Sequence, residues 1–480
     1  MRKNIAIAAC VFLVTATIPA LAFSTNKNDW NWSVETVDYE GKVGRYTSLV
    51  LDSKGYPHIS YCDVGNYDLK YAYWDGSKWI NETVDSKGTT GVPTALVLDS
   101  HEYPHIAYCD FGRADLDYAY WDGAEWNITK KVDDDALSHL ALVLDSHEYP
   151  HIAYAGYHGG LKHAYWDGEW NIEVVDNDSR IGWYSVGAHS IFFLNGQLNI
   201  VYACGNELRH AYKDEQGWHI ETITTEGNDM GYPSSAVDSH GYIHIAYHGW
   251  ENYDLKHVYW DGSKWNVETV ASQGYIGGSC SLALDSHDYP HIACYRTDST
   301  QEKDRDQEYF YWDGSKWNEV VIDSVGYVGG CCDIAIDPND NPVISYCYWQ
   351  HFDLKCARKT TNNPPEKPET PKGFKIGKVG KNYTYSTSSS DPDGEQIYYM
   401  FDWGDGKVTG WLGPYNSGEK VKLTHTWKKN GTYIIRVKAK DIHYSESQWS
   451  NPLVVSMPKT FSLWDLITIW LMHIFKAVIR

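Results

Sequence analysis

The sequence is short of positive charge and of phenylalanine. Lysine and arginine number 41 against 63 aspartates and glutamates, which leaves a net charge of −22 at pH 7. Because nucleic acids and anionic membrane surfaces attract basic proteins, neither is an expected partner. The aromatic residues are 22 tryptophans and 38 tyrosines against 11 phenylalanines. Rings with a polar tip favour strands and half-buried positions over a helical core.

Cysteine spacings typical of a metal knuckle are also missing. Nine cysteines remain once Cys10 is removed with a signal peptide, so at least one is unpaired or pairs with another chain. A disulfide between Cys347 and Cys356, or at the adjacent Cys331 and Cys332, is conceivable but not implied. Four further cysteines are interpreted as small buried side chains within strands: Cys62, Cys109, Cys280 and Cys294.

Long apolar runs are confined to the two ends of the chain. Residues 1–22 combine a basic start, an apolar run and the triplet Ala20-Leu21-Ala22, which is typical of a signal peptide. We therefore expect an exported protein, extracellular or at the cell surface. Residues 458–480 are expected to form an amphipathic helix that lies on a membrane or anchors weakly, since charges interrupt it. Docking on another protein is the alternative.

A tryptophan followed by a strand-like run recurs at intervals of about 47 residues. Its seven copies begin at Trp32, Trp79, Trp126, Trp170, Trp218, Trp265 and Trp317. Each interval holds four short strands, which in one unit are residues 282–285, 290–295, 308–312 and 317–322. Four antiparallel strands repeated at this period, with no helical pattern between them, indicate a β-propeller.

The two ends of the repeat region complement each other. The last repeat stops after its third strand, and Trp32–Val37 is a fourth strand with nothing before it. We therefore expect Trp32–Val37 to pair with Lys355–Arg358 and to close a seven-bladed propeller over residues 28–360.

The most frequent repeated residues have structural explanations. A polar residue opens the turn between the first two strands of each unit, where it can accept backbone N–H bonds: Asp52, Asp99, Asp145, Asn195, Asp238, Asp285 and Asp337. A histidine follows the same turn at His58, His105, His151, His244 and His291. One histidine per blade leaves these side chains too far apart to share a metal ion, so we interpret them as structural.

These motifs carry a resemblance to a known family. The repeat LDSHxYPHIAY, followed by DLKYAYWDG, resembles exported bacterial and archaeal β-propeller repeat proteins and is loosely similar to NHL-type and BNR-type propellers. Sialidases resemble the chain less, because their Asp box has serine before aspartate and here serine follows it. The arginine cluster with which such enzymes hold a carboxylate has no evident counterpart. The resemblance implies a fold rather than a function.

Residues 361–371 form a proline-rich linker, after which the repeat ends. Residues 372–457 closely resemble a PKD domain, an Ig-like β-sandwich, in the segments SSSDPDG, FDWGDG, HTW and GTYIIRV. The resemblance implies an extracellular spacer or adhesive module. A calcium site near Asp391 and Asp393 is conceivable, but we interpret both residues as turn caps. The predicted fold is thus all-β, a seven-bladed propeller and a PKD sandwich followed by a short C-terminal helix.

The loops that join fourth to first and second to third strands lie on one face of a propeller, and here they are irregular and aromatic. The connector at residues 271–278 is expected to face a ligand there. The candidate ligand-binding residues are Trp183, Tyr184, Tyr232, Trp250, Tyr253, Tyr275, Tyr327, Trp349 and Phe352. Their rings can stack on sugars or anchor a peptide, or they can simply cover gaps between blades.

The predicted function is noncatalytic binding or adhesion, with an extracellular glycan or protein as the partner of this face. The alternative is a secreted glycan-active hydrolase or lyase, which needs two carboxylates or a His-containing acid/base pair at the same face. No unit of the repeat carries a unique cluster of His, Glu and Arg, so no catalytic residue, metal or cofactor is assigned. The sequence does not identify the ligand.

Overall fold

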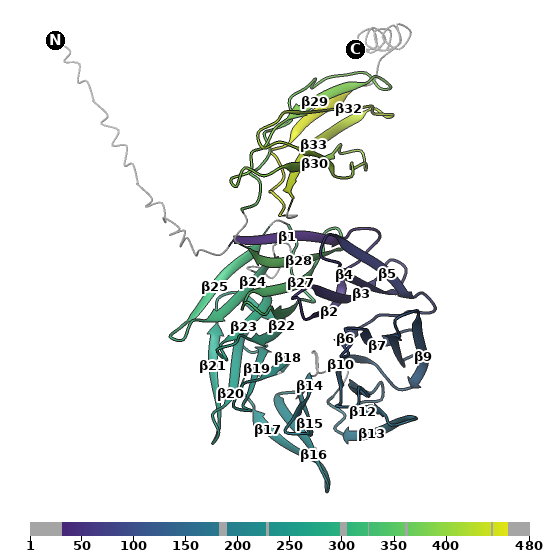
Figure 1. Ribbon diagram of the computed structural model, residues 1–480, viewed down its shortest axis with the longest axis vertical. Helices are drawn as coiled ribbons and strands as arrows, with labels where there is room; N and C mark the ends of the chain where they lie inside the picture. The colour runs from purple at the N-terminus through teal and green to yellow at the C-terminus, as the bar shows by residue number, and fades with distance from the viewer. Residues whose placement is uncertain are drawn as a thin grey trace, which may run out of the picture. The chain divides into compact units, whose positions relative to one another are not determined.

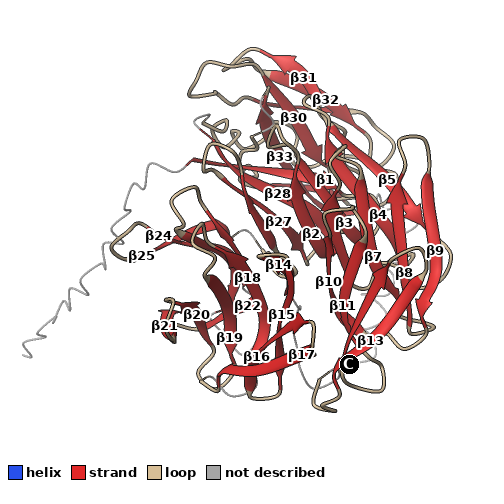
Figure 2. Cartoon of the chain, turned by 60° about the horizontal axis from the view of Figure 1, so that its bottom comes forward, coloured by secondary structure: helices blue, strands red, loops and turns tan. Residues whose placement is uncertain are grey.

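The computed structural model describes residues 31–181, 190–226, 230–297, 305–324, 326–360, 363–442 and 445–458. Within these ranges every regular element is a β-strand, as Figure 2 shows. This part of the chain holds no helix with the length and apolar character needed to cross a membrane. The predicted signal peptide, residues 459–480 of the predicted C-terminal helix, and Trp183 and Tyr184 lie outside the described residues.

Four-stranded antiparallel sheets follow one another along residues 31–360. The first sheet contains β2 (Arg45–Leu51), β3 (Pro57–Asp63), β4 (Asp68–Trp74) and β5 (Trp79–Asp85). The second contains β6 (Thr94–Leu98), β7 (Pro104–Asp110), β8 (Asp115–Trp121) and β9 (Trp126–Asp133). The third contains β10 (Ser138–Leu144), β11 (Pro150–Ala155), β12 (Leu161–Trp166) and β13 (Trp170–Asp176). The fourth contains β14 (Ser190–Leu194), β15 (Gln197–Cys204), β16 (Glu207–Asp214) and β17 (Gly217–Thr224).

Three more sheets complete this region among the described residues. The fifth contains β18 (Met230–Val237), β19 (Ile243–Gly249), β20 (Asp254–Trp260) and β21 (Trp265–Ala271). The sixth contains β22 (Tyr275–Leu284), β23 (Pro290–Thr297), β24 (Arg305–Trp312) and β25 (Trp317–Asp323). The seventh contains β26 (Asp333–Ile336), β27 (Pro342–Tyr348), β28 (Asp353–Thr360) and β1 (Asn31–Asp38). In Figure 1 the first strand of each sheet lies toward the middle of the array and the fourth toward its rim, which is the arrangement of propeller blades.

The seventh sheet is built from both ends of the repeat region. β1 pairs antiparallel with β28, with Trp32 opposite Lys359 and Val34 opposite Ala357. The pairing expected for Trp32–Val37 is therefore present, and it covers the edge that β28 would otherwise expose.

Neighbouring sheets are joined by a repeated pair of hydrogen bonds between their first strands. In the first sheet a bulge interrupts β2 between Arg45 and Ser48, and Tyr46 there has a φ of 57°. The Tyr46 carbonyl accepts from the Thr94 hydroxyl at 3.3 Å, and the Ser48 hydroxyl accepts from the Leu96 N–H at 3.1 Å. We call this pair the inter-sheet latch.

The same latch joins the seventh sheet to the first. The Thr47 hydroxyl donates to the Cys331 carbonyl, and the Leu49 N–H donates to Asp333 Oδ2 at 2.7 Å. Equivalent latches join the fifth sheet to the sixth and the sixth to the seventh, through Cys280 with Leu282 and through Cys332 with Ile334. The S–H of Cys280 donates to the Tyr232 carbonyl at 3.0 Å, so this buried side chain also makes a hydrogen bond between sheets.

The repeated turn and histidine residues have the structural roles expected of them. Asp52 Oδ1 accepts from the backbone N–H groups of Lys54 and Tyr56, and the same pattern recurs at the other aspartates. The fourth unit differs, because Asn195 and Gly196 both take positive φ in a two-residue turn. Each of the five histidines has a ring or hydroxyl partner on the neighbouring third strand, as in the His151 Nδ1 to His163 Nε2 distance of 3.0 Å.

One expectation about local structure is wrong, and the cysteines take one of the alternatives that the sequence left open. Strand β22 starts at Tyr275, so the connector expected at residues 271–278 is mostly strand, because two bulges let its first residues continue pairing with β23. The nine cysteines of the described residues are all free thiols. Cys347 lies opposite Leu354 and Cys356 opposite Ser345, so the register does not place the two thiols face to face.

The C-terminal part forms a β-sandwich. Its strands are β29 (Tyr383–Thr387), β30 (Ile397–Asp402), β31 (Leu412–Tyr415), β32 (Val421–His425), β33 (Gly431–Asp441) and β34 (Leu453–Met457). One sheet has the order β31-β30-β33-β34 and the other pairs β29 with β32. Ile435 and Val437 alternate into a core around the fully buried Trp427, as the sequence predicts.

Candidate functional site

Six of the predicted site residues gather in two groups of rings. Trp250 and Tyr253 come from the loop between β19 and β20, and Tyr275 opens β22; the ring centroids of Tyr253 and Tyr275 are 4.7 Å apart. Tyr327 precedes β26, and Trp349 lies in the loop between β27 and β28 at 6.2 Å from it. The sixth, Phe352, lies 5.9 Å from Trp349. Both groups stand at the same ends of their sheets, because fourth-to-first and second-to-third connections share one face.

Two residues that the sequence-based prediction omitted connect these groups. Tyr295, at the end of β23, stacks on Tyr275 with a centroid distance of 6.3 Å. The guanidinium carbon of Arg305, at the start of β24, lies 4.6 Å from the Tyr295 ring, 4.7 Å from Tyr327 and 5.7 Å from Trp349. Arg305 therefore stands among three rings from two sheets, and we call the whole set the aromatic cluster.

A second arginine reaches the cluster from the first sheet. The guanidinium carbon of Arg45 lies 4.5 Å from the Trp349 ring and 4.9 Å from the Tyr46 ring. Trp349 of the seventh sheet thus contacts one arginine from the sixth sheet and one from the first. Tyr232, on β18, packs with Cys280 and Leu282 beside the cluster, and burial raises its pKa.

Glycines hold two of the rings in place. A Cβ at Gly278 would overlap the Tyr295 ring, and a Cβ at Gly330 would overlap Trp349 Nε1. Each glycine precedes a residue with positive φ, which is Ser279 within β22 at 48° or Cys331 just before β26 at 50°. Tyr46 and Tyr232 have the same left-handed backbone in their first strands, so this local strain recurs at the face where the cluster lies.

His248 supports the rings from below. It is fully buried, its ring lies 4.9 Å from Trp250 and 5.1 Å from Tyr275, and its Nδ1–H donates to the Ile276 carbonyl at 2.7 Å. Burial lowers the pKa of His248 to about 4. At neutral pH it is therefore an uncharged support for Trp250 and Tyr275.

Comparison of equivalent positions shows that His248 and Tyr295 are departures from the repeat. At the end of the second strand the other sheets carry small residues, Cys62, Cys109, Ala155, Ala203 and Cys347. Only the fifth and sixth sheets have a large ring there. This signal is present in the sequence and could have identified both residues.

A second repeated feature is also broken at these sheets. Elsewhere a tyrosine and a cation meet an aspartate of the preceding sheet, as when Tyr202 donates to Asp176 at 2.7 Å and Arg209 donates to it at 2.8 Å. The same arrangement recurs at Tyr61 with Asp38 and at Tyr154 with Asp133. We call it the Tyr-Asp-cation bridge.

Between the fifth and sixth sheets, the aspartate position of this bridge is Ala271 of the fifth sheet, and Cys294 and Glu308 of the sixth sheet occupy the tyrosine and cation positions. Burial raises the pKa of Glu308 to about 7, although the nearby Arg296 opposes the shift. The Glu308 carboxylate is 1% exposed and pairs with Arg296 Nε at 2.6 Å, so this residue is enclosed within the sheet rather than open to a substrate.

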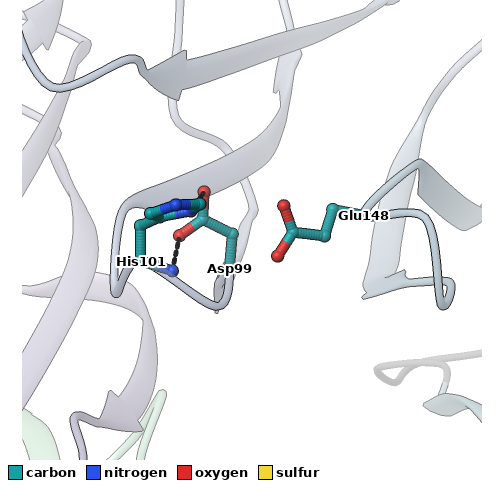
Figure 3. Close-up of side chains that lie close together, drawn as sticks. All are labelled: Asp99, His101 and Glu148. Atoms are coloured by element: carbon teal, nitrogen blue, oxygen red, sulfur yellow. Dashed lines mark hydrogen bonds and ion pairs between the residues drawn. The ribbon is translucent and has the colours of Figure 1, made fainter.

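Three other groups of side chains have the spacing of metal ligands. Figure 3 shows one, in which Asp99 and His101 belong to one turn and Glu148 reaches across from the next sheet. Glu148 Oε1 accepts from the Ser100 N–H at 2.9 Å, so this acid already links two turns. A second exposed group, at Asp238, His240 and Asp288, repeats this arrangement.

The third group lies in the β-sandwich and joins Asp391, Glu395 and Asp441. Asp391 Oδ1 accepts from the backbone N–H groups of Asp393 and Glu395 at 2.9 and 3.2 Å. This is the turn-capping role expected for Asp391.

The fold and the cluster define a class of protein: an array of propeller-type sheets with an aromatic, arginine-bearing face, followed by a β-sandwich. Residues 374–454 match the family model of the PKD domain. They are similar to the PKD domain of an M14-like peptidase from Thermoplasmatales archaeon SCGC AB-540-F20, with 48% identity, 20% of this chain and 99% of that chain covered, and a TM-score of 0.20. The C-terminal part of the chain belongs to the PKD domain family.

The repeat region is similar to solved propeller-like proteins at a lower level. AofleA from Arthrobotrys oligospora is 14% identical, with 62% of this chain and 90% of that chain covered and a TM-score of 0.43. The Hadza microbial sialidase Hz136 is 11% identical, with 66% of each chain covered and a TM-score of 0.38. Likenesses this low carry no conclusion about function, and no curated protein matches the chain.

Proposed function

We propose that this is a noncatalytic extracellular binding protein that recognises a glycan through the aromatic cluster. The observation that carries the proposal is the convergence of Trp250, Tyr253, Tyr275, Tyr295, Tyr327 and Trp349, drawn from three sheets onto one face. Tyr253 is 43% exposed, and Trp250, Tyr275, Tyr327 and Trp349 are half-buried, so ring faces are available to a ligand while packing fixes their orientation. Sugar rings present apolar C–H faces that stack on such side chains.

The scaffold in this proposal is a closed seven-bladed propeller over residues 28–360, with a linker at 361–371 and the PKD domain as a spacer. The latch between the seventh and first sheets and the pairing of β1 with β28 support closure. Closure holds the first, sixth and seventh sheets at fixed distances, which a site shared among them requires. Export and attachment to a surface belong to the same proposal.

A glycan array with the full chain, followed by calorimetry on the best ligand, tests the function. We expect Trp250→Ala and Trp349→Ala each to weaken binding by about tenfold, or ~1.4 kcal/mol, because each removes a stacking face. Phe111→Ala is the matched control, since this ring is 53% exposed on a loop of the second sheet outside the cluster. Unchanged binding in both tryptophan variants would exclude this site, and release of shortened sugars would replace binding with catalysis.

A further inference from the structure

Two arginines of the described residues lack the carboxylate partner that the others have, and both lie in the aromatic cluster. The described residues include eight arginines, of which six form ion pairs with carboxylates. Within that part of the chain Arg45 and Arg305 have no carboxylate partner. For a chain with a net charge of −22, cations without acidic partners require an explanation.

The rings explain how these arginines are held, and Arg45 also hydrogen-bonds the Cys331 side chain, but one donor of each guanidinium has no partner. A guanidinium stacks with its flat face on an aromatic ring, while its N–H groups point outward in its own plane. The Nε atoms of Arg45 and Arg305 are buried and have no hydrogen-bond partner. Arg45 Nη2 makes one bond, to the Tyr46 hydroxyl at 3.3 Å.

A third donor lies between them. Trp349 Nε1 is also buried without a partner, and its ring is the one that both guanidinium groups contact. The Cys331 thiol lies close enough to both arginines for their charges to oppose the effect of burial, which raises its pKa. Cys331 is therefore an uncharged thiol at neutral pH and does not neutralise either arginine.

We infer that Arg45, Arg305 and Trp349 form an anion subsite, and that the glycan bound at the cluster is acidic, with a carboxylate or sulfate on the sugar. Planar guanidinium donors match the two oxygens of a carboxylate or the oxygens of a sulfate ester. The adjacent rings bind the sugar face while the arginines bind its acidic group, so a sugar is favoured over an acidic peptide. The inference rests on the proposed glycan-binding function.

The test compares sugars that differ only in charge. Calorimetry on the full chain uses oligogalacturonate, the neutral galacto-oligosaccharide of the same linkage, and its sulfated form. We expect at least tenfold tighter binding of one or both acidic sugars, with a preference that 0.5 M NaCl reduces. In Arg45→Gln and Arg305→Gln the ratio of acidic to neutral affinity should fall to about 1.

Two controls separate charge from folding. Arg113→Gln removes one positive charge from an exposed arginine that pairs with Asp110 and Asp115 in the second sheet, and it should keep the wild-type ratio. Arg305→Lys keeps the charge but loses the planar donors, so an intermediate ratio supports direct contact. Thermal unfolding of each variant confirms that it is folded.

Each outcome bears on a different statement. Equal affinity for charged and neutral sugars, unaffected by Arg45→Gln, overturns the anion subsite but leaves glycan binding intact. Failure of the wild-type chain to bind any of the three sugars, together with tight binding of a glutamate oligopeptide, overturns both. Binding of oligogalacturonate alone identifies a carboxylate as the anion, and binding of the sulfated sugar alone identifies a sulfate.

Discussion

Removal of the Asp333 side chain tests how the seventh sheet is held to the first. Asp333 begins β26, and its carboxylate accepts from the Leu49 N–H at 2.7 Å, the Ile334 N–H at 3.0 Å and the Ser281 hydroxyl at 2.6 Å. The first of these bonds links the last sheet to the first. Asp333→Ala leaves the buried Leu49 N–H and the Ser281 hydroxyl without this acceptor.

The expected loss in the free energy of unfolding follows from these two donors, which the variant leaves without an acceptor. Each buried donor without a partner costs about 1–3 kcal/mol. Burial raises the pKa of Asp333, so the folded protein already carries a cost for ionising it, and the variant removes that cost. We expect a net loss of ~2–3 kcal/mol at pH 7. Because the folded-state pKa is raised, the wild type gains relative to the variant as the pH falls toward that pKa.

Differential scanning calorimetry or urea unfolding of the full chain measures this loss. Ser234→Ala is the matched control, because Ser234 has the same position in the fifth sheet and accepts only the Leu282 N–H, at 3.0 Å. We expect ~1 kcal/mol for this neutral bond. Equal losses in the two variants, or an Asp333→Ala protein as stable as the wild type, would refute the special role of this junction.

Two further predictions concern the whole propeller region. Burial lowers the pKa values of His151 and His248 to about 4, so below about pH 6.5 the unfolded chain binds protons that the folded chain does not. The free energy of unfolding should therefore fall by about 1–2 kcal/mol per histidine between pH 7 and pH 5. Calorimetry that shows the same stability at pH 7 and pH 5 would contradict this. Deletion of residues 31–38 should expose the edge of β28 and produce oligomers in light scattering, and a monomer as stable as the wild type would contradict closure by β1.

Much of the fold could be predicted from the sequence because the repeat is regular. Most second strands begin at proline and most fourth strands begin at tryptophan, so these boundaries recur at similar spacings. The strand at Trp32–Val37 has no preceding strand in the repeat, which predicts that it pairs with the third strand of the last repeat. The bulges at Tyr46 and Tyr232 could not be predicted in this way. A left-handed tyrosine within a strand contradicts its local preference, and inter-sheet hydrogen bonds stabilise it only in the folded chain.

The candidate site was predicted where aromatic residues were expected on loops. Trp250, Tyr253 and Trp349 follow from strand order, because the order decides which connections share a face. Tyr295 was expected within a strand and Arg305 is not aromatic, so a search for aromatic rings on loops omitted both. Arg45 and Arg305 are far apart in the chain, and both contact the Trp349 ring only in the folded protein.

The departures from the repeat and the aromatic cluster occur in the same sheets, and a physical reason connects them. A Tyr-Asp-cation bridge packs a tyrosine and a long cationic side chain between neighbouring sheets. The hydrogen bond to the aspartate fixes the direction of the tyrosine side chain. In the sixth sheet the bridge is absent, the tyrosine is displaced by one residue to Tyr295, and Tyr295 consequently points to the opposite face of its strand. A one-residue exchange between Cys294 and Tyr295 therefore converts a buried structural ring into a ring of the proposed site. The Arg296 and Glu308 ion pair lies in the sixth sheet where most other sheets have the cation of the bridge.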